Sequence, residues 1–131
     1  MTSTGSTQRN QRSFGPTTDG MLSFQKLHVY QRSIEFLALA LEVIRDLPKG
    51  TAELADQLLR AAQSQPRNIA EGAGRRSAAD QARFYAIARG SAMEAAAALD
   101  TMRLMETISQ PRYDRGIELL EGIVAMLTKM C

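Results

Sequence analysis

The sequence has few of the residues that most catalytic and metal sites use. Its 131 residues include one histidine, one cysteine and no tryptophan. With a single cysteine, Cys131, no disulfide can form within the chain, and a reducing, cytoplasmic environment is expected. A ferritin-type metal pair needs two Glu-x-x-His motifs, but the residue three before His28 is Gln25. The composition therefore predicts a protein without enzymatic activity, metal or cofactor.

Long apolar runs are missing as well. Residues 1–20 are rich in Ser, Thr, Gly and Gln and contain no apolar run, so no secretory signal or membrane anchor is expected there. We predict that residues 1–22 form a disordered tail. No later apolar stretch approaches the roughly 18 to 20 residues that span a bilayer. Residues 23–131 are predicted to form one domain without membrane contact, since 44% of all residues are hydrophobic and 23% charged.

Apolar residues recur at helical spacing in four segments, at about residues 27–47, 51–72, 77–105 and 111–130. Pro48 and Gly50 end the first, Ser77 and Asp80 resemble a capping box for the third, and Pro111 suits the first turn of the last. No segment alternates as a strand would. Short connections between the helices predict an all-α, antiparallel up-down-up-down four-helix bundle.

The first helix carries the apolar stretch FLALALEVI, residues 36–44. A helix that is apolar around most of its circumference needs burial on more than one side. We therefore expect one face to pack inside the monomer and another to contact a partner chain in a homo-oligomer.

The loop GAGRRS, residues 72–77, combines two glycines, two arginines and the start of a long helix. Free backbone N–H groups and guanidinium groups suit phosphate, which makes the loop a candidate anion site. An ordinary helix stop with a solvated arginine pair is the alternative. In an antiparallel bundle, this end also collects other cations, and the candidate nucleic-acid residues are Arg67, Arg75, Arg76 and Arg83. A protein–protein adaptor without a nucleic-acid role is the competing function.

Pro66 lies inside the second helix, where a proline removes a hydrogen bond and costs roughly 3 kcal/mol. It is predicted to kink this helix and turn polar side chains toward the third helix near Gly90. Buried polar groups need partners. We expect a structural network of Asn68, Glu71, Ser91 and Glu94, with Arg60 or Arg83 as a further member. The alternative is that Glu71 and Glu94 act on a proton as an enzymatic pair.

Two segments carry a family resemblance: RAAQSQPRNIAEGAGRRSAADQARFYAIARGSAMEA, residues 60–95, and FQKLHVYQRSIEFL, residues 24–37. They resemble the four-helix-bundle proteins encoded by intervening sequences of bacterial 23S rRNA genes. The resemblance implies a homopentamer. It also implies kinship with the accessory variability protein of diversity-generating retroelements, which binds nucleic acid and a reverse transcriptase. This chain departs from the family where Tyr30 replaces a tryptophan, Gln65 an isoleucine and Ala73 an aromatic residue.

Overall fold

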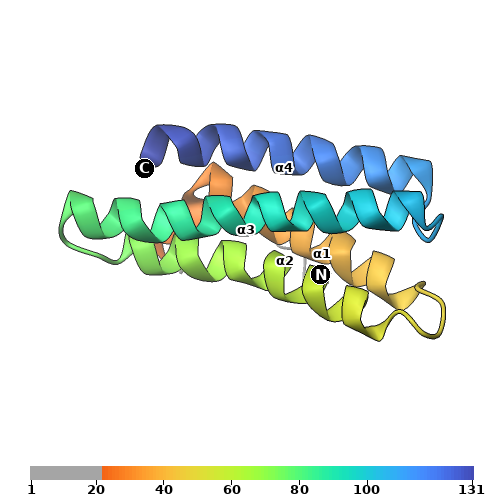
Figure 1. Ribbon diagram of the computed structural model, residues 1–131. Helices are drawn as coiled ribbons and strands as arrows, with labels where there is room; N and C mark the ends of the chain where they lie inside the picture. Colours follow the sequence, from red (N-terminus) through yellow and green to blue (C-terminus); the bar gives the residue numbers. More distant parts are fainter. Residues whose placement is uncertain (1–21) are drawn as a thin grey trace, which may run out of the picture.

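The computed structural model describes residues 22–131, and within that range the chain forms helices and no strand. A short 3-10 turn, η1 (Ser23–Lys26), precedes four α-helices. These are α1 (His28–Arg45), α2 (Ala52–Ala73), α3 (Ala78–Leu104) and α4 (Gln110–Met130). Figure 1 shows the four helices lying side by side, with consecutive helices running in opposite directions. The expected all-α four-helix bundle is confirmed.

Side-chain contacts show how the helices are paired. Ser64 of α2 bonds to Ser91 of α3, and Gly72 near the end of α2 lies against Tyr85 near the start of α3. Contacts between α3 and α4 likewise run in opposite order, from Arg89 with Thr128 to Tyr113 with Asp100. Neighbouring helices are therefore antiparallel, and α1 closes the bundle by packing against both α2 and α4.

Side-chain caps mark the starts of the two later helices. The Ser77 hydroxyl accepts a hydrogen bond from the Asp80 N–H at 3.1 Å, and Ser109 accepts one from the Arg112 N–H at 3.4 Å. Pro111 lies in the first turn of α4, as predicted. Each cap satisfies an N–H that the helix itself leaves unpaired. The sequence therefore placed these helix starts to within a residue.

The turn between α3 and α4 ends α3 in a Schellman motif. The Thr107 N–H donates to the Met102 carbonyl and the Glu106 N–H to the Arg103 carbonyl. Glu106 has a φ of 59°, the left-handed conformation that glycine usually supplies at this position. Gly50, with a φ of 90°, has the equivalent freedom in the connection between α1 and α2.

Pro66 is buried, and α2 continues as α-helix from Ala52 to Ala73 on both sides of it. The preceding residue, Gln65, is also fully buried, and its side-chain amide donates to the Ala61 carbonyl at 3.1 Å. Its other polar atom, Oε1, has no partner among the described residues. The expected kink at Pro66 stays a prediction, and the hydrogen bond from Gln65 to the backbone was not predicted.

The core runs the length of the bundle. Its largest fully buried side chains include Phe36, Leu58, Ile69, Leu99 and Ile123. Gly116 of α4 lets the helices approach here, because a Cβ at that position would lie 2.7 Å from Leu99 and 3.4 Å from Leu39. This close approach joins α4 to both α1 and α3.

The apolar stretch of α1 is covered only in part by its own chain. Phe36, Ala40 and Val43 are buried, but the Leu41 side chain is 47% exposed and Ala38 is exposed. The predicted tail, residues 1–22, lies outside the described residues apart from Leu22, which immediately precedes η1.

Candidate functional site

The connection between α2 and α3 brings three of the four predicted nucleic-acid residues together. Arg75 and Arg83 flank the ring of Phe84, with their guanidinium carbons 4.7 and 4.5 Å from the ring centroid. Arg76 is exposed and has no interaction with another described residue. We call Arg75, Arg76, Arg83 and Phe84 the loop cluster. The aromatic member was missed in the sequence, although Phe84 directly follows Arg83 there.

The carboxylates near the loop cluster are bound only locally. Glu71 pairs with Arg75 at 2.8 Å and Asp80 with Arg83 at 3.6 Å, one helical turn away in each case. All four side chains are more than 40% exposed. Exposed pairs of this kind contribute little to stability. The guanidinium groups can therefore turn to an external anion without loosening the bundle.

The loop itself is held in place by its neighbours. The Gln81 side-chain amide donates to the Arg75 carbonyl at 3.0 Å, and Ser77 caps α3. Gly72 is required for close approach, because a Cβ there would lie 2.7 Å from the Tyr85 ring and 3.2 Å from the Gln81 carbonyl oxygen. The loop cluster thus projects from a packed helix junction.

Arg67, the fourth predicted residue, lies apart from the loop cluster. It lines a groove of about 560 Å³ between α2 and α3, together with Arg60 and Glu94. We call this hollow the α2–α3 groove. Its floor is made of small residues, which include the buried Ala61, Ser91 and Ala98.

A buried polar network lies at this groove, but its membership differs from the predicted one. The Asn68 amide donates to the Ser64 carbonyl at 2.8 Å and to the Ser64 hydroxyl at 3.0 Å. The Ser91 hydroxyl donates to the same Ser64 oxygen at 2.7 Å. Ser64 is therefore the centre of the network, and it was not singled out in the sequence.

The prediction was wrong about the two glutamates. Glu71 is exposed and bonds to Arg75, and Glu94 is exposed at the edge of the α2–α3 groove without a partner among residues 22–131. The helical phase explains the first error, because Asn68 and Gly72 share the inner face of α2 and Glu71 projects outward. No contact joins Glu71 to Glu94, so no carboxylate pair forms.

On the opposite side of the bundle, arginines join α4 to α1. Arg112 donates to Asp46 at 2.6 Å, and Arg115 bonds to both Glu35 and Glu118. The hydrogen bond from Arg112 lowers the pKa of Asp46 below its usual value. Partial burial would raise the pKa of Glu35, but hydrogen bonds from Arg32 and Arg115 outweigh it and lower the pKa. We call the interface between α1 and α4, with these ion pairs on its surface and Gly116 in its interior, the α1–α4 seam.

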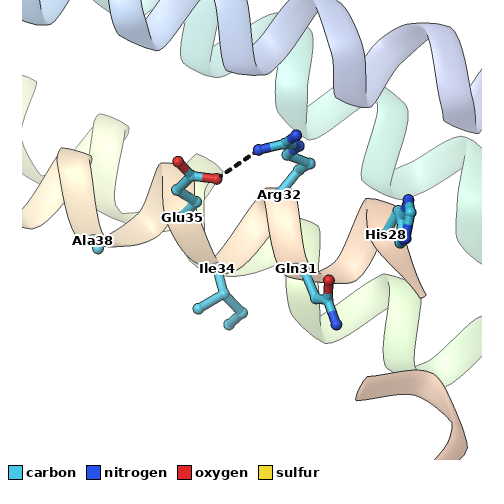
Figure 2. A pocket seen from close by; sticks show the side chains of 6 residues that line it. All are labelled: His28, Gln31, Arg32, Ile34, Glu35 and Ala38. Atoms are coloured by element: carbon cyan, nitrogen blue, oxygen red, sulfur yellow. Dashed lines mark hydrogen bonds and ion pairs between the residues drawn. The ribbon is translucent and has the colours of Figure 1, made fainter. Parts of the chain in front are cut away.

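His28 lines a shallow hollow along α1, shown in Figure 2. There Arg32 and Glu35 turn toward each other in an ion pair, while Ile34 projects to the other side of the helix.

Residues 22–131 contain no group of three or more His, Cys, Asp or Glu side chains placed to hold a metal. None of the helices in this range is both long and apolar enough to cross a membrane.

The fold and the loop cluster together define an antiparallel four-helix bundle with an arginine-bearing helix junction. The model of the 23S rRNA-intervening sequence protein family matches residues 25–129. The chain belongs to this family, as its two signature segments indicated.

A solved structure supports the same assignment. The chain is similar to a protein of unknown function from the S23 ribosomal protein family of Bacteroides thetaiotaomicron, with 25% identity and a TM-score of 0.72. The similarity covers 78% of this chain and 96% of that one. No curated protein matches the sequence.

Proposed function

We propose that this protein is a non-catalytic, cytoplasmic homo-oligomer that binds RNA or DNA through its arginine-rich end. The observation that carries the proposal is the loop cluster, in which two guanidinium groups stack on the Phe84 ring and Arg76 stands free beside them. Guanidinium groups held against a ring keep their N–H donors for phosphate oxygens, and their outer faces offer planes on which a base can stack. Arg67 would extend the positive surface along α2.

Exposed apolar side chains support self-association. Leu41 of α1 and Met93 of α3 are each nearly half exposed, and Met93 borders an apolar groove of about 300 Å³ between α3 and α4. Contact between such surfaces on neighbouring chains would bring several loop clusters into one assembly, which strengthens binding to a polyanion. The family resemblance sets the proposed number of subunits at five. It also makes a reverse transcriptase the protein partner if the chain belongs to the retroelement branch.

The nucleic-acid arm of the proposal is tested by fluorescence anisotropy of labelled RNA and DNA 20-mers at several salt concentrations. Binding should weaken steeply with salt, since each neutralised phosphate contributes a slope of about −0.9 to log K against log salt for duplex DNA and about −0.7 for single strands. Arg75→Ala with Arg76→Ala should flatten that slope. Arg45→Ala with Lys49→Ala removes two exposed cations elsewhere and should leave it unchanged. Absence of binding at low salt would refute the nucleic-acid role.

The oligomer is tested separately by light scattering. The wild-type chain should have a mass several times that of the monomer, and Leu41→Glu or Met93→Glu should reduce it. A wild-type chain that has the mass of a monomer would contradict the proposed assembly. If that monomer still bound nucleic acid, the nucleic-acid role would be supported and the oligomer refuted.

An adaptor is the second candidate function, and one feature favours it. Leu104 and Met105 at the α3–α4 turn are 85% and 52% exposed, far from the loop cluster. A protein partner that binds this turn should be retained on the immobilised chain after nuclease treatment. Leu104→Ser with Met105→Ser should release it.

A further inference from the structure

The α2–α3 groove carries charges that the bundle itself does not use. Arg60, Arg67 and Glu94 have no hydrogen bond or ion-pair partner within residues 22–131. By contrast, most arginines elsewhere on the described surface bond to a carboxylate or stack on a ring. Three unpaired charges along one groove are free to interact with a charged partner.

The register of the helices places opposite charges across the groove. Ser64 and Ser91 are bonded and therefore lie at the same level. Because α3 runs antiparallel to α2, Glu94 lies three residues beyond Ser91 and faces the level of Ala61, beside Arg60. These two side chains nevertheless form no ion pair, so the groove between them is open.

The spacing along α2 fits a helical ligand. Arg60 and Arg67 are seven residues apart, which is two turns and about 10 Å along the axis. A helix of another molecule lying in the groove would present side chains of the same face at the same seven-residue interval. The small floor residues Ala61, Ser91 and Ala98 would let its backbone approach closely.

Two features favour a peptide helix over a nucleic-acid strand. No aromatic ring lines the groove in the described part of the chain, so bases would have no stacking surface. Glu94 at the edge would repel phosphates, but it suits a lysine or arginine.

We propose that the α2–α3 groove docks an amphipathic helix of a partner protein. The docked helix carries small residues on its buried face, carboxylates seven residues apart toward Arg60 and Arg67, and a basic residue toward Glu94. This site lies beyond the proposed nucleic-acid function: it shares Arg67 with the proposed nucleic-acid surface, but Arg60 and Glu94 have no part in that surface.

The test uses the full-length chain and two labelled synthetic helices with alanine at their buried heptad positions. One peptide has glutamate along one edge and lysine along the other, and the second has glutamate along both. Anisotropy should show the mixed peptide binding wild type about tenfold more tightly than the acidic one, since several charge pairs change together. Glu94→Lys should reverse that preference, and Arg60→Glu should weaken the binding of both peptides.

Glu53→Lys is the matched control, because it makes the same charge change at an exposed position of α2 that does not line the groove. It should leave the preference as in wild type. Thermal melts of each variant verify folding. Equal binding of both peptides, no binding, or no reversal by Glu94→Lys would overturn the proposal.

An RNA titration tests whether the α2–α3 groove binds nucleic acid instead of a helix. If Arg60→Glu reduces RNA binding while peptide binding is unaffected, the groove is a nucleic-acid track and the helix proposal fails. If only the loop-cluster variants lose RNA binding, RNA does not use the groove, and the peptide measurements alone decide the helix proposal.

Discussion

The two sides of the bundle solve the packing problem in opposite ways. Along the α1–α4 seam the interior is apolar around Gly116, and arginines outside it join two helices through carboxylates. On the α2–α3 side the interior holds Gln65 and the Ser64 network, while the arginines outside bond only to carboxylates three or four residues away or to none. The same residue type therefore stabilises tertiary structure on one side and is available to ligands on the other.

Overpacking the seam should have the largest effect. Gly116→Leu would drive a side chain into Leu99 and Leu39, and it should lower the free energy of unfolding by about 2–3 kcal/mol in urea titrations. At Gly122 on the same helix an added Cβ meets nothing within 4 Å, so Gly122→Ala should be neutral or mildly stabilising through helix propensity. Equal losses at the two glycines would show that the seam is not the tightly packed side.

Replacing the buried Gln65 amide tests the α2–α3 side of the bundle. Gln65→Met keeps the length of the side chain and removes an oxygen that has no partner, so stability should rise by about 1–2 kcal/mol. Gln63→Met makes the same change at an exposed position of α2 and should have almost no effect. A loss of stability in Gln65→Met would mean that the amide bond to Ala61 outweighs the unpaired oxygen.

The polar network gives a smaller effect. Ser64→Ala removes the acceptor shared by Asn68 and Ser91 and should lower stability by about 1 kcal/mol, measured by calorimetry. Glu71→Ala, which the predicted network would have made destabilising, should leave the melting temperature nearly unchanged because Glu71 is exposed. The opposite ranking would restore Glu71 to the network.

Acid should loosen the seam slightly. The pKa values of Glu35 and Asp46 are lower in the folded chain than their usual 4.5 and 3.8. The unfolded chain therefore binds more protons in this range, and stability falls as the pH drops from about 4.5 through the lowered pKa values. The side chains are largely exposed, so the loss is small. Arg115→Ala should flatten the dependence on pH, whereas Arg75→Ala should leave it unchanged.

The fold was predictable because its signals are local. Apolar spacing, the Ser77 cap and Pro111 each act within a turn or two, and the structure places all of them as expected. The two segments that resemble the family identified it correctly, since the family's sequence model matches residues 25–129. Local signals of this kind do not depend on how the helices are rotated against each other.

The site was only partly predictable because it depends on helical phase. The stacking of Arg75 on Phe84 requires two segments to meet across the loop, and no spacing rule anticipates that contact. Glu71 is three residues from the buried Asn68, which is close in sequence but already on the outer face. Ser64 was overlooked because its role depends on Ser91, which is 27 residues away.

The left-handed Glu106 distinguishes the two turns at one end of the bundle. At Gly50 any side chain would introduce strain, so that position tolerates little variation. At Glu106 a strain of about 1 kcal/mol is already present, and a change to glycine could relieve it. Thermal tolerance can therefore be added at a corner of the molecule that touches neither the arginine junction nor the groove beside α2.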